Sequence, residues 1–336
     1  MSQKLWRFPV LTSTVAMFCI TTAAAHEIVG NRLFPATLTI DDPGVNDELA
    51  FPTVSYFKTA TTPDTSAYRQ TDISGEFSKR ITDDFAISIG PTWSHFSPPG
   101  GPVMTGANGF QNLETTFKYR LYKNDEHEFV FSTGLSIEWG GGGAQSVGAD
   151  PFSTYTPTVY FGKGFGDLPV DWLRPFAITG VIGYSIPKTG STITTSQDPD
   201  SGNAIVDAEF HPRVLNWGGS LQYSMPYLKS TVVDLGLPDF VNHLIPIVEA
   251  SLQTPVSNTF TSGTVTTGTI NPGIIWTGQY MQVGVEALIP VNRESGSNIG
   301  VIGQLHFYLD DIAPNTLGRP IFSSSNINTG RPMFGR

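Results

Sequence analysis

Apolar and polar residues alternate along many short stretches of this chain. In residues 279–290, QYMQVGVEALIP, every second residue from Met281 to Ile289 is apolar, Val283 and Val285 among them. Gln282 and Glu286 belong to the other set of alternate positions. Successive side chains of a β-strand point to opposite faces, so this pattern predicts a strand with one apolar and one polar face. We expect lipid on the apolar face and a water-containing, polar interior on the other.

The same period of two predicts twelve strands along the chain. The first is the least clear, because Pro52 interrupts its pattern. Segments of this length exceed the usual strand of about 5–6 residues and match the roughly 9–11 residues with which a tilted strand crosses a bilayer. The predicted strands are residues 48–58, 68–79, 84–95, 110–122, 127–139, 154–163, 175–186, 213–225, 243–254, 268–277, 279–290 and 298–310.

The connections between these segments alternate in length. Those after odd-numbered segments are mostly long and rich in Gly, Ser, Thr and Pro, such as GGGGAQSVGADPFS, whereas several after even-numbered ones are tight, such as KNDE. A transmembrane barrel with both ends in the periplasm has long outer loops and short inner turns. The connection at 226–242, PYLKSTVVDLGLPDFVN, departs from this rule because it is long on the short side.

Aromatic residues mark both ends of several apolar rows, for example Phe85 with Trp93 and Phe129 with Trp139. Aromatic girdles at this spacing are typical of the two membrane interfaces. The sequence therefore predicts an all-β fold, an antiparallel transmembrane β-barrel of about twelve strands, with ten or fourteen as alternatives. A soluble β-sandwich also alternates, but its strands are shorter and its connections are not sorted by parity.

The N-terminus has the features of a secretory signal. Lys4 and Arg7 precede an apolar stretch, and Ala23 to Ala25 form a small-residue cleavage site, so we expect the mature chain to begin at His26. The predicted organisation is a signal peptide at 1–25, a pre-barrel segment at 26–46 with a short plug as one option, a barrel at 47–310 and a tail at 311–336.

Composition narrows the function classes. A net charge of −10 argues against a nucleic-acid partner. The single cysteine, Cys19, lies in the predicted signal peptide, so we expect no disulfide or thiol chemistry. The oxygen-rich stretch TIDDPGVNDE at 39–48 lacks the order of an EF-hand loop and is more typical of a turn. We predict no cofactor and no metal site.

Charged residues on the polar faces predict the lining of the lumen. A carboxylate facing hydrocarbon costs several kcal/mol, so these residues need water or partners. The tight turn at 123–126 would place Arg120 opposite or diagonal to Glu128 near the inner rim. The predicted lumen-lining residues are Asp72, Glu76, Glu114, Lys118, Arg120, Glu128, Glu138, Glu249, Glu286 and His306.

The interior charges allow two interpretations. An acidic excess would favour cations or polyhydroxy solutes, whereas an internal salt-bridge network would fill and stiffen a barrel of this modest bore. A third hypothesis comes from His95 and Ser97, two residues apart on one strand face, a spacing that a membrane-embedded hydrolase can use. Because no orienting third group or oxyanion hole is identifiable, we predict no catalytic residues and a protein that is not an enzyme.

Two stretches, HEIVGNRLFPATLTIDDPGVNDEL and LQYSMPYLKSTVVDLGLPDFVNHLIPIVEASLQTP, resemble a group of poorly characterised proteobacterial outer-membrane proteins. These are described as transporter-like and are allied to the barrels of meta-pathway phenol degradation. The resemblance implies a Gram-negative outer-membrane barrel and passage of small molecules, aromatic ones among them. It carries over no binding residue. The last predicted strand ends near Leu309, so the terminal strand aromatic of many such barrels is missing there.

The leading hypothesis is passive passage of small solutes, aromatic or cationic ones included, across the outer membrane. The alternative is a closed barrel with a structural or surface-interaction role, and its mark would be an interior blocked by side chains or by the N-terminal segment. The expected partners are outer-membrane lipid and a small-molecule solute, with no nucleic acid.

Overall fold

The computed structural model describes residues 27–61, 67–97, 106–197, 204–259 and 264–322. They form a closed antiparallel β-barrel of twelve strands, which confirms the predicted fold class and strand number. The predicted signal peptide and cleavage site lie outside the described residues, as does the end of the tail beyond residue 322.

The barrel strands follow the predicted segments closely. Two wall strands are interrupted: β5 and β6 are halves of one strand separated by Pro91, and β7 and β8 are halves of the next. The strands are β3 (Glu48–Lys58), β4 (Arg69–Thr82), β5 (Phe85–Gly90), β6 (Thr92–Ser97), β7 (Ala107–Phe110), β8 (Leu113–Asn124), β9 (Phe129–Trp139), β10 (Thr154–Gly164), β11 (Phe176–Pro187), β14 (Arg213–Tyr223), β15 (Leu244–Ser257), β16 (Thr267–Thr277), β17 (Met281–Pro290) and β18 (Gly300–Tyr308).

The wall closes where the last strand meets the first. β18 pairs antiparallel with β3, placing Val301 opposite Tyr56 and Phe307 opposite Leu49, and β3 pairs in turn with β4. Among the described residues, closure pairs the wall strands on both sides, except that the short β7 at the rim pairs with β6 alone. Most backbone groups of the wall are therefore satisfied within the sheet, as a bilayer requires.

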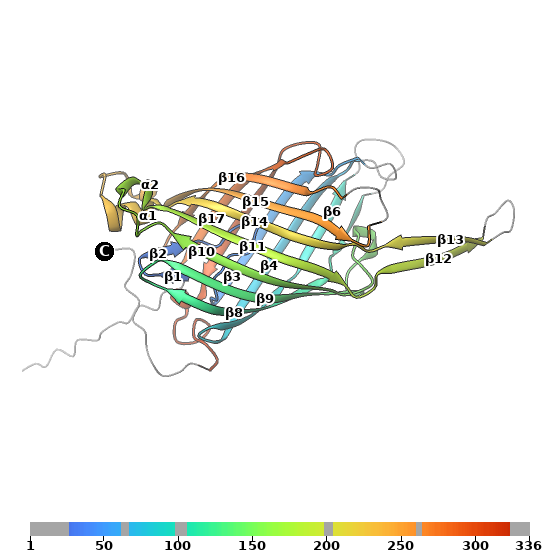
Figure 1. Ribbon diagram of the computed structural model, residues 1–336, viewed down its shortest axis with the longest axis horizontal. Coiled ribbons are helices and arrows are strands. Elements are labelled where there is room, and N and C mark those ends of the chain that lie inside the picture. The colour runs from blue at the N-terminus through green and yellow to red at the C-terminus, as the bar shows by residue number, and fades with distance from the viewer. Residues whose placement is uncertain (1–26, 62–66, 98–105, 198–203, 260–263, 323–336) are drawn as a thin grey trace, which may run out of the picture.

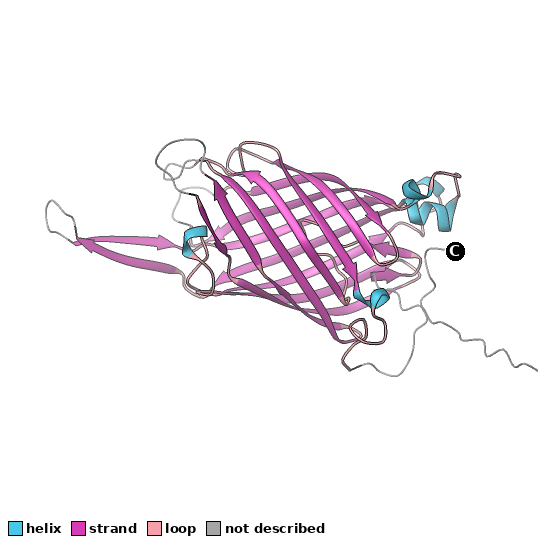
Figure 2. Cartoon of the chain, turned by 180° about the vertical axis from the view of Figure 1, so that it is seen from behind, coloured by secondary structure: helices cyan, strands magenta, loops and turns pink. Residues whose placement is uncertain are grey.

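The two ends of the barrel differ (Figure 1). One end carries a two-stranded ribbon, β12 (Ser191–Gln197) with β13 (Ala204–Phe210), which projects beyond the wall. The opposite end carries short helical turns, seen again from behind in Figure 2. They are α1 (Met225–Tyr227), η3 (Leu228–Val232) and α2 (Asp239–Asn242), so the connection that broke the length rule folds into helix at this end. Two further turns of 3-10 helix are η1 (Gln145–Val147) and η2 (Asp171–Leu173).

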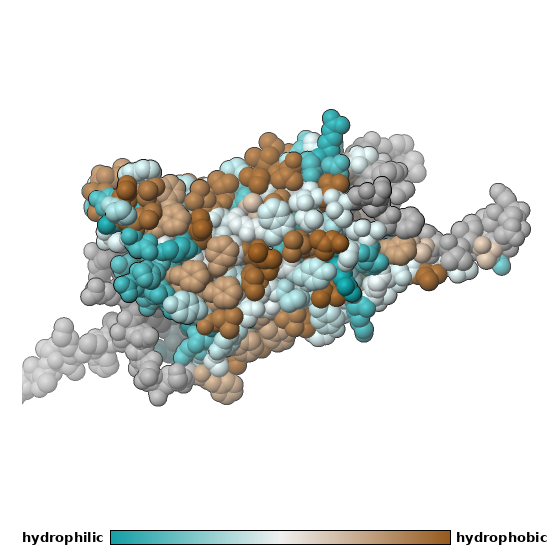
Figure 3. Space-filling model, viewed as in Figure 1, coloured by the Kyte–Doolittle hydropathy of each residue, from teal (hydrophilic) through white to brown (hydrophobic). Residues whose placement is uncertain are grey.

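The described part of the chain contains no helix long and apolar enough to cross a membrane. The outer face of the wall is instead apolar. On β17, Val285 is 48% exposed and Glu286 is 1% exposed, so the two faces are assigned as the alternation predicts. Figure 3 shows apolar side chains gathered over the middle of the wall, with hydrophilic ones toward both ends.

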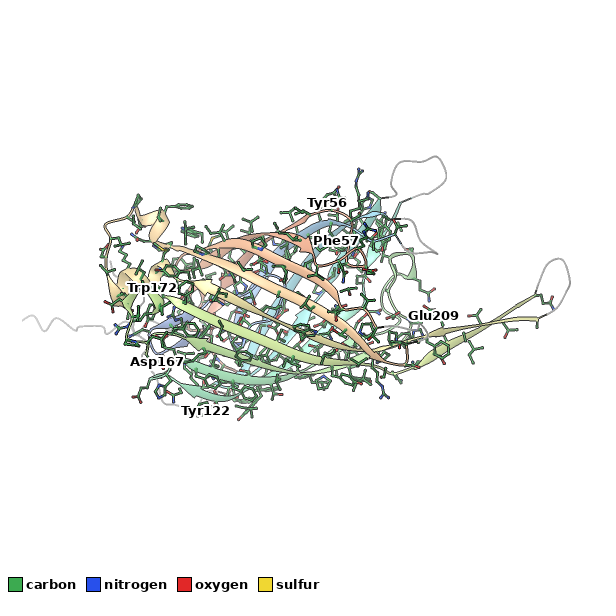
Figure 4. The ribbon with its side chains drawn as sticks, turned by 45° about the horizontal axis from the view of Figure 1, so that its top comes forward. Tyr56, Phe57, Tyr122, Asp167, Trp172 and Glu209 are labelled. Carbon is green, nitrogen blue, oxygen red and sulfur yellow. The ribbon has the colours of Figure 1, made fainter. Side chains whose placement is uncertain are left out.

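Exposed aromatic residues lie near both ends of the wall. Figure 4 places Tyr122 and Trp172 toward the helical end and Tyr56 toward the other. Amphipathic rings prefer the boundary between hydrocarbon and water, so these positions fit the two rims of an apolar belt. Together with the apolar middle, they give the barrel the exterior of a membrane-spanning protein.

The chain after the last strand returns to the barrel rim. α3 (Leu309–Ile312) follows β18 directly, and the backbone N–H groups of Ile321 and Phe322 donate to the carbonyl oxygens of Arg80 and Ile81 at 3.2 and 2.8 Å. Residues 309–322 therefore pack beside the end of β4.

Candidate functional site

Residues 27–47, here called the inner segment, lie inside the barrel. Ser132 of β9, Gln282 of β17 and Ser78 of β4 donate to backbone carbonyl oxygens of this segment at 2.6, 2.6 and 3.0 Å. Strands so far apart around the wall can reach one segment only if it lies within the barrel. The segment begins with a small hairpin of β1 (Glu27–Val29) and β2 (Arg32–Phe34), visible in Figure 1 at the helical end.

The inner segment packs against one side of the wall through apolar side chains. Leu33 and Leu38 are buried against inward-facing residues of β15 to β18, and burying each such side chain stabilises by about 1.5–3 kcal/mol. A smaller cluster joins Val29 and Phe34 to Val130 and Ala177. The wall residues of the larger cluster are Ile245, Ile247, Ile275, Leu288 and Ile302.

Glu249 anchors the middle of the inner segment. Its carboxylate accepts from the backbone N–H groups of Leu38, Thr39 and Ile40 at 2.9, 2.8 and 3.2 Å, and from the Thr39 hydroxyl at 2.5 Å. Glu249 is fully buried. An irregular backbone buried inside a barrel needs partners for its N–H groups, and this carboxylate supplies them for three consecutive residues.

Glu286 lies beside this anchor and is equally enclosed. It interacts electrostatically with Glu249, and neither of its carboxylate oxygens has a hydrogen-bond partner among the described residues. Both acids face the interior of the barrel, but neither lines the cavity that remains there. They therefore do not present open charge to a passing solute.

Arg32 ties the hairpin of the inner segment to the helical end. Its guanidinium donates to Glu128 at 3.2 Å and to the carbonyl oxygens of Pro175, at 2.9 Å, and Arg174. It also lies over the ring of Tyr227, 3.7 Å from the centroid. Arg32 is fully buried, and this burial lowers its pKa, against the attraction of Glu128, which raises it.

The predicted pair between Arg120 and Glu128 is wrong. Arg120 holds both carboxylate oxygens of Glu27, at 3.0 and 2.9 Å, and also binds Asp84 at 2.8 Å, while Glu128 binds Arg32. In the register of β8 with β9, Arg120 lies opposite Ser132, and Glu128 lies in the turn just before β9 begins at Phe129, so the two are not neighbours across the hairpin. The inner segment then supplies a partner of opposite charge to each residue, which a hairpin model of the wall cannot include.

A second ionic cluster fixes the end of the inner segment to the rim. The buried carboxylate of Asp47 binds Lys79 at 2.5 Å and the Arg80 guanidinium at 2.9 Å. Arg80 also reaches Asp310 of α3 at 3.0 Å. Burial raises the pKa of Asp310 well above its ordinary value although Arg80 opposes the shift. The cluster joins three separate parts of the chain: the inner segment, β4 and the tail.

A cavity of about 260 Å³ remains beside the inner segment. It lies between segment residues 36–42 and the wall formed by β18, β3, β4, β5, β6 and β8. Its lining is polar, with hydroxyl groups and five acids. The acids are Asp41, Asp42, Glu48, Glu76 and Glu114.

The bases near this cavity have acidic partners. The Lys118 ammonium binds Asp41 at 2.6 Å and the Asp42 carbonyl oxygen at 3.0 Å, and His306 Nε2 lies 3.1 Å from Glu48. Burial raises the pKa of Asp42 to about 7. Lys118 and the Gly44 N–H lower that pKa, while Glu48 and Asp41 raise it.

The last two predicted lumen residues, Asp72 and Glu138, also lie outside the cavity lining. Asp72 accepts from Ser94 at 2.6 Å, and Glu138 accepts from the Asn112 amide at 3.0 Å. Neutral donors therefore hold Asp72, whereas Glu76 and Glu114 line free space.

The hypothesised hydrolase residues are in contact. Ser97 Oγ and His95 Nε2 are 2.9 Å apart at the end of β6. The His95 ring is stacked parallel to Trp93, with centroids 6.0 Å apart. Ser94, which lies between Trp93 and His95 in the sequence, points inward to Asp72. His95 and Ser97 therefore belong to the outer face. Within the described residues, no hydrogen bond orients the other ring nitrogen of His95, and no group of three or more potential ligands is placed to hold a metal ion.

Sequence analysis did not identify the inner segment's own functional residues. Glu27, Arg32 and Leu38 belong to no strand of the wall and follow no period, so alternation assigns them no face. One signal was available: interior positions such as Ile245, Ile247 and Leu288 are apolar. Apolar side chains on the inward face of a wall imply that something apolar covers them.

Comparisons with known proteins concern the fold. No family model matches the chain, and no curated protein matches it. Similar solved structures include a NanC porin (10% identity over 76% of this chain and 98% of that chain, TM-score 0.41). Others are the β domain of the Bordetella autotransporter BrkA (10%, 78% and 98%, TM-score 0.45) and a TodX mutant described as a monoaromatic hydrocarbon channel (8%, 77% and 88%, TM-score 0.39). These likenesses are too distant to inform function.

Proposed function

We propose that this protein is an outer-membrane β-barrel through which small polar solutes pass passively, with the inner segment restricting the passage. The apolar outer face and aromatic rims support a place in a membrane. The observation that carries the proposal is the polar cavity beside the inner segment, because a barrel built only as a structural shell has no need of free, charged space in its interior.

The asymmetry of the interior supports a specific route. The inner segment is fixed by apolar contacts to β15–β18, and polar free space lies between the segment and the wall that runs from β18 through β3 to β8. Solutes would cross on the polar side, next to Glu76 and Glu114. The acidic excess there favours cations over anions.

A reversible disulfide tests whether the inner segment restricts passage. The three heavy atoms nearest to a Cβ added at Gly284 all belong to the Leu38 side chain, with Cγ at 3.3 Å, so Leu38→Cys with Gly284→Cys can form a bridge between segment and wall. We expect lower conductance in planar bilayers when the bridge is oxidised and recovery on reduction, because a fixed segment cannot move aside.

The single variants Leu38→Cys and Gly284→Cys control for the substitutions, since neither can form the bridge. Equal conductance of oxidised and reduced double variant would show that the segment does not restrict passage. A protein that never conducts in any of these states would instead favour the closed barrel with a structural or surface-interaction role, for which the extensive contacts of the inner segment are the supporting observation.

The contact between Ser97 and His95 supports a second candidate, a membrane hydrolase acting on lipid at the outer rim. A serine is activated as a nucleophile by a neighbouring histidine. Purified protein in mixed micelles of phospholipid would release fatty acid, and Ser97→Ala would abolish the release. Absence of release by the wild-type protein would eliminate this candidate without affecting the channel proposal.

A further inference from the structure

The cavity beside the inner segment has more acids than bases. Among the described residues, Lys118 binds Asp41 and His306 faces Glu48, whereas Glu76 and Glu114 have no basic residue within ion-pair distance. Carboxylates removed from bulk water and left without a counter-charge are costly. A positive charge bound in the cavity would compensate these carboxylates.

The arrangement of the acids on the wall increases this need. Gly90 of β5 pairs with Glu114 of β8, and Glu114 lies directly opposite Glu138 of β9. Like charges opposite one another in a sheet destabilise it. The Asn112 amide relieves Glu138, whereas the partners given for Glu114 are hydroxyl groups, those of Thr116 at 3.4 Å and of Ser136. A cation in the cavity would relieve the repulsion at Glu114.

Two side chains of the lining, His306 and Gln304, have hydrogen-bonding atoms without a partner among the described residues. His306 is 3% exposed and its Nδ1 has no hydrogen-bond partner, and the same holds for Oε1 of Gln304. Both residues lie on β18 and line the same cavity as Glu114 and Glu76. An unpaired buried polar atom costs about 1–3 kcal/mol, so these atoms also indicate a missing polar partner.

The chemistry of the lining selects the class of ligand. In the described part of the chain the acids are too dispersed to form a metal cluster, which disfavours a single divalent ion. No Phe, Tyr or Trp lines the cavity, which disfavours the aromatic solute that the family resemblance implies. Glu76 and Glu114 stand two strands apart, about 10 Å at the backbone. A ligand that carries two positive charges separated by an aliphatic chain matches this spacing.

We infer that this cavity binds a small aliphatic diamine or polyamine, with one ammonium group toward Glu76 and another toward Glu114. The hydroxyl groups of the lining, such as those of Thr53, Ser88 and Thr92, accept the remaining N–H donors. The inference deepens the proposed function by naming its solute class, and as a statement about transport it rests on that function. Binding itself is measurable without transport.

Calorimetric titration of the purified full chain in detergent micelles tests the inference. We expect saturable binding of 1,4-diaminobutane and none of the neutral 1,4-butanediol. Glu76→Gln and Glu114→Gln should each weaken diamine binding about tenfold or more, the scale expected when one partner of an enclosed charge pair is removed. Asp72→Asn is the matched control, because this acid faces the interior outside the cavity, and it should bind like the wild type.

Three results would overturn the inference: no diamine binding, equal binding of the diol or of Mg²⁺, or binding unchanged in both Gln variants. If Glu114→Gln fails to assemble, Glu76→Gln carries the test. The two proposals fail in different ways. A protein that binds diamine but never conducts would support the binding site and contradict the channel function. A protein that conducts but binds no diamine retains the channel and loses the site.

Discussion

Glu249 shows how one interior side chain orders a stretch of chain that has no regular structure. It lies in the alternating pattern of β15 as any inward acid would, yet its carboxylate accepts four hydrogen bonds from Leu38, Thr39 and Ile40. Hydrogen bonds to a charged group contribute about 1.5–3 kcal/mol each. A residue that sequence analysis predicted to line the lumen is therefore an anchor of the inner segment.

Replacing Glu249 should release this anchor. We expect Glu249→Ala to leave three backbone N–H groups without partners, which weakens docking of the inner segment by at least about 3 kcal/mol. Hydrogen exchange at Leu38, Thr39 and Ile40 should accelerate accordingly. Val248→Ala, which changes the neighbouring outward side chain, is the control. Unchanged exchange in Glu249→Ala would mean that the apolar contacts alone hold the segment.

At the scale of the element, β17 illustrates both what alternation predicts and what it omits. Val285 faces outward and Glu286 inward, as the period of two requires. The pattern does not show that Leu38 covers Gly284, where an added Cβ would meet the leucine at 2.6 Å. Close approach of the inner segment thus depends on a wall residue that lacks a side chain.

A charge on the outer face of β17 should destabilise the barrel. Val285 lies near the middle of this strand, so we expect Val285→Arg to cost about 2–4 kcal/mol, the range for a basic residue facing lipid at the bilayer midplane. Urea unfolding in lipid vesicles measures the change. Val285→Leu keeps the position apolar and should have little effect. A negligible effect of the arginine would contradict the assignment of this face to lipid.

β8 and β9 show a limit of reasoning from hairpins. The turn between them lies at residues 125–128 instead of the predicted 123–126, and Glu128 belongs to this turn with a left-handed backbone, φ +47°. A shift of the turn by two residues changes every cross-strand partner in the hairpin. The partners that Arg120 and Glu128 find instead come from residues about 90 or more positions away in sequence.

For the whole molecule, the inner segment and the wall form one ionic system. Asp42 lies at its centre, faced by Lys118, Asp41, Glu48 and the Gly44 N–H. Because burial raises its pKa from 3.8 to about 7, the docked segment holds a proton that an undocked segment releases. This contribution to docking is complete below the ordinary pKa of an aspartate and is lost as the pH rises through about 7.

Docking should therefore weaken as the pH rises. We expect conductance to be higher at pH 8 than at pH 5, because ionised Asp42 opposes the docked state. Asp42→Asn cannot ionise and should reduce the difference, while Asp72→Asn, at an interior acid held by Ser94, should leave it unchanged. Conductance that falls with rising pH in the wild-type protein would contradict the sign of this prediction.

The number of strands, their bounds and their two faces followed from the sequence by itself, because the alternation of side chains along a strand is a local property of the backbone. Residues 48–58, where Pro52 blurs the pattern, are β3 at the same bounds. The tertiary structure decided what occupies the interior. The inner segment has no period of its own, and its partners are brought near only when the wall closes around it. The roles of Glu249, Glu128 and Arg120 thus depend on contacts between distant parts of the chain, which no local pattern encodes.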